Sequence, residues 1–319
     1  MSPLEEEFYN FFFLVAVVFV AVVRTATSFL LYFVPRWLKS RRKDIRGQKV
    51  LITGAGSGVG RQLAIEFSKH ATCLILVDID RQSLLQTEKL LDRRSPVFIY
   101  DCDVSDYGKV YEMAEKVKKD AGDVDILVNN AGIVAGKYLL DLPEEKIVRT
   151  MEVNTLAHFW TVKAFLPTMI ERNSGHLVTT GSIAGKIGLP KMTDYCASKF
   201  AAMGFVEALE KELRGQKVDG VKVTIVCPAH IDTGLFQGLK VTLGSILTPE
   251  YVAKEIVLGV LEEQETIFLP HFLKHVFVLR EMVPRWFLIK CFEITGNIKM
   301  MDNFTGRQTN DVNKPVKTD

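Results

Sequence analysis

Short apolar runs rich in β-branched residues alternate with stretches of helical periodicity through the middle of the chain. The runs cover residues 50–53, 73–78, 97–101, 126–129, 176–180 and 223–227. Runs of this length are typical of buried strands, and helical segments between them indicate βαβ units with right-handed crossovers. We therefore predict an α/β fold with a doubly wound parallel sheet, which binds its ligands at the carboxyl ends of the strands.

A longer apolar stretch precedes this region. Residues 11–34 carry one charge, Arg24. As a helix they would reach about 36 Å, enough to cross a hydrocarbon core of about 30 Å. Polar residues at 24–28 interrupt the stretch, so a half-inserted or hairpin-like anchor and a buried helix of the globular domain remain as alternatives. Three glutamates at 5–7 occupy the place of the basic region of a cleaved signal peptide. We expect an uncleaved N-terminal membrane-anchor helix.

Charges on the two sides of this stretch differ. Glutamates precede it, and basic residues at 36, 39 and 41–43 follow it. Positive charge favours the cytosolic side of a membrane, so we expect the rest of the chain to face the cytosol. The basic cluster would contact anionic headgroups or form a solvated linker.

Composition fits one large domain with appendages, because 48% of the 319 residues are apolar. The 40 basic and 38 acidic side chains give a net charge of +2. No cationic excess is left to hold a phosphate polymer, so nucleic acid is not an expected partner. The cysteines are odd in number and widely spaced, which favours buried thiols in a reducing compartment. They are Cys73, Cys102, Cys196, Cys227 and Cys291.

A glycine-rich turn, Gly54-Ala-Gly-Ser-Gly-Val-Gly60, directly follows the first apolar run. Glycines let the backbone approach a pyrophosphate, whose charge then rests on a helix N-terminus. The next run ends in Asp78, where a carboxylate accepts hydrogen bonds from ribose hydroxyls and repels a 2′-phosphate. NAD is therefore favoured over NADP. The alternatives are a structural glycine turn, and an Asp78 that caps a turn with Asp80 and is neutralised by Arg81.

Tyr195 and Lys199 are one helical turn apart and therefore share a face. A cation beside a phenol stabilises the phenolate and lowers its pKa from about 10, which makes a usable acid/base. Ser182 stands 13 residues upstream at the end of an apolar run, where its hydroxyl would hold a substrate oxygen against the tyrosine.

From about residue 46 to residue 265 the chain resembles the short-chain dehydrogenase/reductase superfamily, which has the Rossmann-type fold. The resemblance is carried by TGAGSGVG at 53–60, Asp103-Val104, NNAG at 129–132, Asn154, Ser182, YCASK at 195–199 and Pro228 with Thr233. It implies that Tyr195 is the acid/base and that Lys199 lowers its pKa and holds the nicotinamide ribose. Ser182 would orient the substrate oxygen, and Asn154 would support a water-mediated proton path.

The resemblance also implies the cofactor contacts. The glycine turn would hold the pyrophosphate, Asp103 and Val104 would meet adenine, and the loop from Pro228 to Thr233 would meet the carboxamide. Ala229 stands where the family has glycine, which alters the loop rather than the chemistry. The full cofactor set is Gly54, Ser57, Gly58, Val59, Gly60, Asp78, Asp103, Val104, Asn130, Ala131, Gly132, Tyr195, Lys199, Pro228 and Thr233.

Segments 157–170, 194–205 and 233–238 are similar to a microsomal group of that superfamily. The group contains retinol dehydrogenase 10, epidermal retinol dehydrogenase 2, the retinaldehyde reductase called short-chain dehydrogenase/reductase 3, and lipid-droplet 17β-hydroxysteroid dehydrogenases. This resemblance implies a lipophilic small-molecule substrate, a place on the endoplasmic reticulum membrane or a lipid droplet, and a homodimer built on the helix that carries Tyr195. The ending at 301–307 is similar to the reductase, whereas Asp78 matches the members that use NAD.

An amphipathic segment follows the predicted domain at 266–304. Its apolar positions recur at helical spacing until Pro284, and basic residues lie between them. Such a segment would lie in a membrane interface and admit substrate from lipid, or would pack on its own domain. His271 and His275 are four residues apart but lack a third ligand, so no metal site is expected. Residues 305–319 are polar and predict a disordered tail.

These features favour an enzyme that oxidises all-trans-retinol to all-trans-retinal with NAD. The alternatives are a 17β-hydroxysteroid or fatty-alcohol dehydrogenase, an NADPH-type retinaldehyde reductase, and a non-catalytic lipid-droplet scaffold. Substrate identity depends on a pocket formed by residues 183–192 and by the segment after Thr233.

Overall fold

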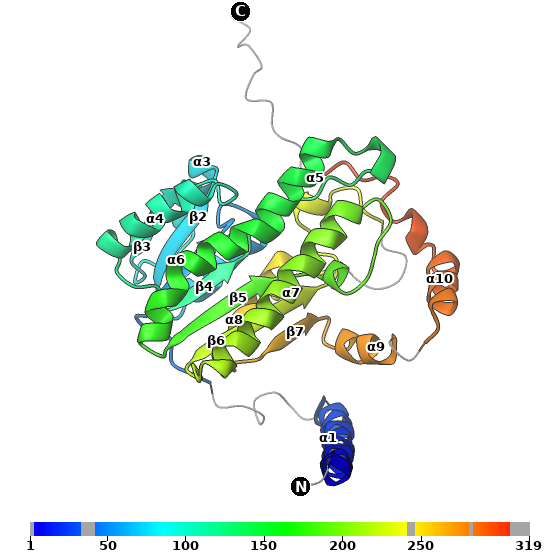
Figure 1. Cartoon of the computed structure of the whole chain (residues 1–319). Coiled ribbons are helices and arrows are strands. Elements are labelled where there is room, and N and C mark those ends of the chain that lie inside the picture. The colour runs from blue at the N-terminus through cyan, green and yellow to red at the C-terminus, as the bar shows by residue number, and fades with distance from the viewer. Residues whose placement is uncertain (1–2, 33–41, 241–245, 281–282, 307–319) are drawn as a thin grey trace, which may run out of the picture. The chain divides into compact units, whose positions relative to one another are not determined.

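A computed structural model of the chain describes residues 3–32, 42–240, 246–280 and 283–306. The chain divides into two compact units, Met1–Arg42 and Lys43–Asp319. The first unit contains helix α1 (Pro3–Tyr32), and the second contains the sheet and the remaining described helices (Figure 1).

The described part of the second unit is built on one sheet of seven parallel strands, in the order β3-β2-β1-β4-β5-β6-β7. The strands are β1 (Lys49–Thr53), β2 (Cys73–Asp78), β3 (Val97–Asp101), β4 (Ile126–Asn129), β5 (Gly175–Thr180), β6 (Val221–Pro228) and β7 (Thr266–Leu269). The predicted doubly wound sheet is confirmed. The strand order reverses between β1 and β4, and a doubly wound sheet binds its ligand at such a switch point.

Strand β7 was not expected, because its residues were assigned to the amphipathic C-terminal segment. It pairs with β6 in register from Ile225 opposite Thr266 to Pro228 opposite Leu269. Ile267 and Leu269 are buried in the core. The sheet therefore continues beyond residue 265.

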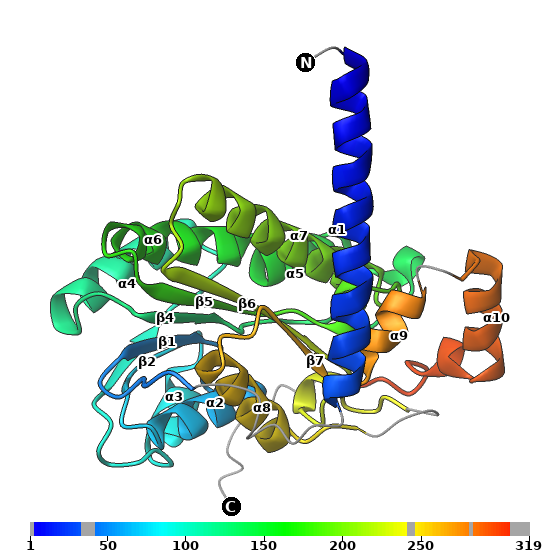
Figure 2. The same ribbon diagram turned by 90° about the horizontal axis from the view of Figure 1, so that it is seen from below.

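Helices cover both faces of the sheet (Figure 2). One face carries α2 (Gly58–Ser68), α3 (Arg81–Glu88) and α8 (Pro249–Leu261), and the other carries α4 (Tyr107–Asp120), α6 (Ala157–Glu171) and α7 (Thr193–Gly215). Alternate strand residues supply both layers: Ile52 packs towards α2 and α8, and Leu51 packs towards α4 and α6.

Side-chain caps fix where several of these helices begin. The Asp80 carboxylate accepts hydrogen bonds from backbone N–H groups in the first turn of α3, and Asp106 does the same for α4. Thr248 caps α8, and Pro249 occupies the first turn, where its missing N–H costs nothing. These starts set the direction in which each helix leaves the edge of the sheet.

A π-helical turn, Glu152–Leu156, lies between α5 (Glu144–Met151) and α6. The wider turn adds a residue relative to an α-helix and shifts the faces of the two helices. It places Asn154, which is fully buried, beside the loop that follows β4.

After β7 the chain forms α9 (Leu273–Arg280) and α10 (Arg285–Ile294), and Pro284 is the N-cap of α10, as its predicted break requires. Several large apolar side chains here are exposed, Leu279, Trp286 and Ile294 among them. In α1, too, large apolar side chains such as Phe11 and Phe13 are exposed. Within the described ranges no helix is both long and apolar enough to cross a membrane. Attachment through α1 therefore stays a prediction.

Candidate active site

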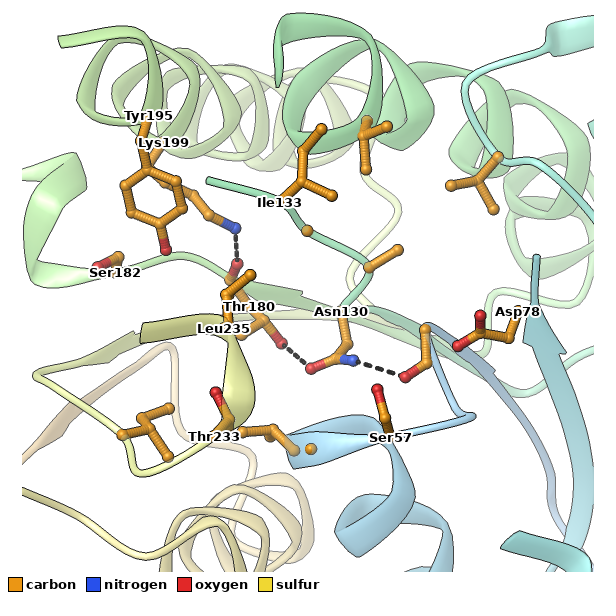
Figure 3. Close-up of a pocket in the computed structure, with 18 of the residues that line it drawn as sticks. Ser57, Asp78, Asn130, Ile133, Thr180, Ser182, Tyr195, Lys199, Thr233 and Leu235 are labelled. Carbon is orange, nitrogen blue, oxygen red and sulfur yellow. Dashed lines mark hydrogen bonds between the residues drawn. The ribbon is translucent and has the colours of Figure 1, made fainter. Parts of the chain in front are cut away.

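A cleft opens at the carboxyl ends of the strands, with an empty volume of about 1180 Å³ that includes space open to solvent. Most of the predicted site residues line it, and Figure 3 shows Asp78 near one end and Tyr195 with Lys199 at the other. Those at the wall are Gly54, Ser57, Gly58, Val59, Asp78, Asp103, Val104, Asn130, Ala131, Gly132, Ser182, Tyr195, Lys199, Pro228 and Thr233. Gly60 and Asn154 lie behind the wall.

The glycine turn is held too tightly for side chains at two positions. Gly54 has φ +68°, and a Cβ there would lie 2.9 Å from the Cα of Ala131. A Cβ on Gly60 would lie 2.0 Å from the carbonyl oxygen of Gly54. Gly60 therefore allows the start of α2 to pack directly against the turn, and its predicted contact with a cofactor stays a prediction.

Asp78 is tied to the backbone of this turn. One carboxylate oxygen accepts a hydrogen bond from the Gly56 N–H at 2.9 Å, and the other accepts one from the Asp80 N–H at 3.1 Å. Arg81 pairs with Asp101 at 2.9 Å. The carboxylate thus does cap a turn that includes Asp80, while Arg81 gives its charge to a different partner. Asp78 also faces the cleft, where it remains available to ribose hydroxyls.

Asp103 has a partner that the sequence did not indicate. Arg149 on α5 donates to its carboxylate at 2.7 Å, and Ser105 donates at 2.7 Å. Burial favours a raised pKa, but these hydrogen bonds outweigh it and lower the pKa of Asp103. Arg149 also lines the cleft and brings a guanidinium to the predicted adenine end.

Asn130 joins three strand ends. Its backbone N–H donates to the Thr53 hydroxyl at 2.9 Å, and its Nδ2 donates to the Thr53 carbonyl at 3.0 Å. Thr180, at the end of β5, donates to its Oδ1 at 3.5 Å (Figure 3). Asn130 therefore fixes the floor of the cleft, which explains its place beside the cofactor residues.

Tyr195 and Ser182 meet as predicted. The Tyr195 hydroxyl points towards Ser182 in Figure 3, and both side chains are less than a tenth exposed. Burial raises the pKa of Tyr195, and a hydrogen bond between the two hydroxyls opposes that rise. Ser182 also accepts a hydrogen bond from the Ala184 N–H at 3.1 Å, which fixes its side chain.

Lys199 lies one turn further along α7, and its ammonium group is hydrogen-bonded to the end of β5. Its Nζ donates to the carbonyl oxygen of Thr180 at 2.8 Å and lies 5.8 Å from the centroid of the Tyr195 ring. Burial lowers the pKa of Lys199 to about 8. Burial is the largest influence on Tyr195 and raises the pKa of the phenol, and the role of Lys199 in lowering that pKa stays a prediction.

Asn154 is held on all sides by the protein. It accepts from the Ile133 N–H at 2.8 Å and donates to the Ile133 carbonyl at 2.9 Å and to the Ser198 hydroxyl at 3.0 Å. Ser198 in turn donates to the Tyr195 carbonyl at 2.7 Å. The amide thus links the loop after β4 to the helix that carries the tyrosine. The predicted proton path remains a prediction.

His158 is a buried polar group that the sequence did not single out. It is 2% exposed, and both ring nitrogens lack a hydrogen-bond partner among the described residues. Burial, and secondarily the charge of Lys199, lower its pKa to about 3, so the imidazole is neutral. The charge of Lys199 lowers the pKa of His158 only because the two side chains are close, so His158 lies in the electrostatic field of the site.

The substrate side of the cleft is apolar. Leu235 and Phe236, in the short helix Gly234–Phe236, line it together with Ile231. The Phe236 ring meets the Tyr195 ring edge-on, with centroids 5.7 Å apart at 88°. The segment after Thr233 therefore lines the cleft, whereas residues 183–192 are not part of its lining.

The residues present fit a dinucleotide. The cleft has an acidic end at Asp78, bare glycine backbone in the middle and a cationic end at Lys199. A Cβ on Gly132 would lie 3.4 Å from Asn154 Oδ1 and 3.6 Å from Lys199 Nζ, so glycine keeps open the space beside the lysine. Within the described residues, no group of three or more His, Cys, Asp and Glu side chains is placed to hold a metal ion.

The chain is similar in sequence to known proteins. A family model described as short chain dehydrogenase matches residues 48–243. Retinol dehydrogenase 10-B of Danio rerio is 39% identical over 321 residues, which cover 92% of this chain and 96% of that protein. Estradiol 17-beta-dehydrogenase 11 of Homo sapiens is 43% identical over 270 residues, which cover 84% of this chain and 88% of that protein.

Solved structures share the fold. A short chain dehydrogenase/reductase from Burkholderia phymatum, in complex with NAD, is 28% identical with a TM-score of 0.67 and covers 73% of this chain and 93% of its own. An alcohol dehydrogenase from the archaeon Thermococcus sibiricus, complexed with 5-hydroxy-NADP, is 28% identical with a TM-score of 0.62. The match covers 69% of this chain and 95% of that protein.

Proposed function

We propose that this chain uses NAD to oxidise a long apolar alcohol, with all-trans-retinol as the first candidate. The chain belongs to the short chain dehydrogenase family and is a nicotinamide-dependent alcohol oxidoreductase. The observation that carries the proposal is the buried pair of Tyr195 and Ser182 hydroxyls, which faces an apolar wall in the cleft at the carboxyl ends of the strands. A relative named as a retinol dehydrogenase, similar over 92% of the chain, supports the substrate class.

The catalytic work of the protein is to hold and move one proton. Ser182 would bind the alcohol oxygen, and Tyr195 would take its proton when the alcohol is oxidised, or return one when a carbonyl is reduced. A bound nicotinamide would accept the hydride. Because burial raises the pKa of Tyr195, the protonated phenol is the resting form at neutral pH, and the alcohol-to-carbonyl direction requires that this proton leaves first.

Lys199 and its neighbours offer a route for that proton. The ammonium donates to the Thr180 carbonyl, and its pKa of about 8 lies close enough to neutrality for it to release a proton. Asn154 fixes the backbone of Ile133 next to this group. We propose that Lys199 also binds the ribose of the cofactor, which would bring its charge closer to the phenol and lower the phenol's pKa.

The preference for NAD rests on Asp78. Its carboxylate faces the cleft at the end of β2, where a 2′-phosphate would meet a negative charge. Asp78→Ala should raise kcat/KM with NADP relative to NAD by at least about tenfold, a change of about 1.4 kcal/mol. An unchanged ratio would mean that Asp78 does not read the ribose.

A steroid alcohol is the second candidate, because a relative that is 43% identical is named as an estradiol 17-beta-dehydrogenase. The same hydroxyl pair would serve either substrate, so the pocket wall decides between them. The discriminating experiment is NADH formation by the full chain in microsomes, with all-trans-retinol and with oestradiol supplied separately. A higher kcat/KM for oestradiol would replace retinol by a steroid, and no NADH with either would overturn both assignments.

The chain's expected place is the cytosolic face of the endoplasmic reticulum membrane or of lipid droplets. Support comes from the exposed apolar side chains of α1 and from the basic residues that follow it in the sequence. Membrane lipid would then be both the support of the protein and the source of its substrate. A homodimer formed through α7 belongs to the same proposal. Carbonate washing of membranes that contain the full chain tests the attachment.

A further inference from the structure

The last described residues, 300–306, cross the substrate side of the molecule, and we call this segment the strap. Figure 1 draws it as the red trace beyond α10. Met300 and Met301 are 3% and 1% exposed and belong to an apolar cluster that also contains Tyr195. Residues 305 and 306 were expected to begin a disordered tail, but they are hydrogen-bonded within the domain. The remainder of that predicted tail, 307–319, lies outside the described residues.

The strap holds the loop after β6 by its backbone. The N–H groups of Thr305 and Gly306 donate to the Gln237 carbonyl at 2.9 and 3.3 Å, and the Lys240 N–H donates to the Met300 carbonyl at 2.9 Å. Gly238 has φ +85°, and a Cβ there would lie 1.9 Å from the carbonyl oxygen of Asn303. The loop and the strap therefore run in direct backbone contact.

Two more loops at the same end of the sheet meet the strap. The Phe304 ring lies on Gly136 in the loop after β4, where an added Cβ would be 2.1 Å from its Cε1. Asp302 pairs with Lys191, in the loop after β5, at 2.7 Å. Lys191 Nζ also lies 4.6 Å from the centroid of the Tyr138 ring. Loops from three consecutive strands of the sheet thus converge on seven residues.

The two ends of the loop after β6 are supported by different parts of the molecule, one on the cofactor side of the cleft and one on the substrate side. Leu235 and Phe236, which form the apolar wall, stand between Thr233 and Gln237 in the chain. Thr233 lies against Gly58 of the glycine turn, at 3.3 Å from a Cβ built there, whereas Gln237 is held by the strap. Loosening the strap would therefore release the wall while the cofactor end of the loop keeps its own support.

We propose that the strap determines substrate specificity: it fixes the apolar wall formed by Leu235 and Phe236, and thereby favours long apolar alcohols over short ones. This inference rests on the proposed function, because it concerns the same pocket. A long substrate needs the whole wall, while a short alcohol needs only the hydroxyl pair and the adjacent ring of Phe236. Gly136, Phe304 and the ion pair are positioning residues, since none of them lines the cleft.

The test displaces the Phe304 ring without touching the cleft. Gly136→Ala places a methyl group against that ring. Gly47→Ala is the matched control, because Gly47 has φ +72°, close to the φ of +69° at Gly136, but has nothing within 4 Å of its Cβ position. Gly136→Ala should weaken binding of all-trans-retinol and raise its KM about tenfold, with kcat, the KM for NAD and the KM for hexanol changed less than about twofold. Gly47→Ala should leave all of these values unchanged.

A second comparison separates the ring from backbone strain at Gly136. Phe304→Ala should raise the retinol KM as Gly136→Ala does. The double variant should have the same retinol KM as Phe304→Ala alone, because the methyl group added at residue 136 then meets no ring. Asp302→Asn should shift the retinol KM in the same direction by about twofold to fivefold, the range of a partly exposed ion pair.

Retinol binding with NADH present is measured by equilibrium dialysis with radiolabelled retinol, so the strap can be assessed without turnover. Equal weakening of retinol and hexanol, a raised KM for NAD, or retinol binding unchanged in Gly136→Ala and Phe304→Ala would overturn the role of the strap. Failure of the wild-type chain to oxidise any alcohol would overturn the proposed function instead, and the binding comparison would still decide the strap.

Discussion

Replacing Lys199 with methionine should stabilise the fold at neutral pH while it impairs catalysis. The Lys199 side chain is 3% exposed, and burial lowers its pKa from 10.5 to about 8. The protein therefore carries a cation at neutral pH in a place that disfavours charge. Methionine has similar length and keeps the packing of α7, but removes the charge.

The size and sign of the effect follow from the two pKa values. The difference between 10.5 and about 8 corresponds to roughly 3 kcal/mol of disfavoured charge below pH 8. Above about pH 8 the folded chain has released this proton and the unfolded chain has not, so wild-type stability recovers as the pH rises to about 10.5. Losing the hydrogen bond to Thr180 costs about 1 to 3 kcal/mol at every pH. Lys199→Met should thus be more stable than the wild type by up to about 2 kcal/mol at pH 7, and less stable by about 1 to 3 kcal/mol near pH 10.5.

The assay is urea unfolding of the full chain in mild detergent, followed by tryptophan fluorescence at both pH values. Tyr195 is present in both proteins, so its ionisation at high pH cancels in the difference. Lys211→Met, at an exposed position of the same helix, controls for loss of a charge. The same stability difference between Lys199→Met and wild type at pH 7 and at pH 10.5 would refute the reasoning.

Two further predictions concern the glycine turn and the hydroxyl pair. Gly60→Ala should destabilise the fold by about 3 kcal/mol in thermal unfolding, because the added Cβ would meet the Gly54 carbonyl. The control is Gly204→Ala on α7, whose added Cβ meets nothing within 4 Å and should stabilise the helix slightly. Ser182→Ala should lower kcat for alcohol oxidation about a hundredfold and move the rise of kcat with pH to higher pH, since the Ser182 hydrogen bond lowers the pKa of Tyr195; a pH profile that does not move would contradict this.

The parts of the fold that the sequence predicted are those with a local signal. The first six strands are short β-branched runs, and the glycine turn, Ser182 and the pair of Tyr195 and Lys199 stand at fixed distances from them. Strand β7 has four residues, TIFL, in a segment rich in Phe and Leu. An apolar run of that length is compatible with a strand or with part of a helix, and only its pairing with β6 identifies it as a strand.

The support around the site could not be predicted, because its contacts join residues far apart in the chain. Arg149 on α5 reaches Asp103 in the loop after β3, and Lys199 donates to the Thr180 carbonyl 19 residues earlier. The effect of burial on the pKa of Tyr195 depends on how the surrounding helices and loops enclose the phenol. The spacing of Tyr195 and Lys199 in the sequence therefore does not indicate that this pKa is raised. The strap is a similar case, since no local pattern at 300–306 indicates contact with Gly136.

The most direct test of the account compares the wild-type chain with Tyr195→Phe. Phenylalanine keeps the buried ring against Phe236 and removes the hydroxyl that meets Ser182. We predict that the variant binds NADH within about twofold of the wild type and loses at least about a hundredfold in the rate of NADH formation from all-trans-retinol. Equal rates for the two proteins would contradict the assignment of Tyr195 as the acid/base and, with it, the proposed mechanism.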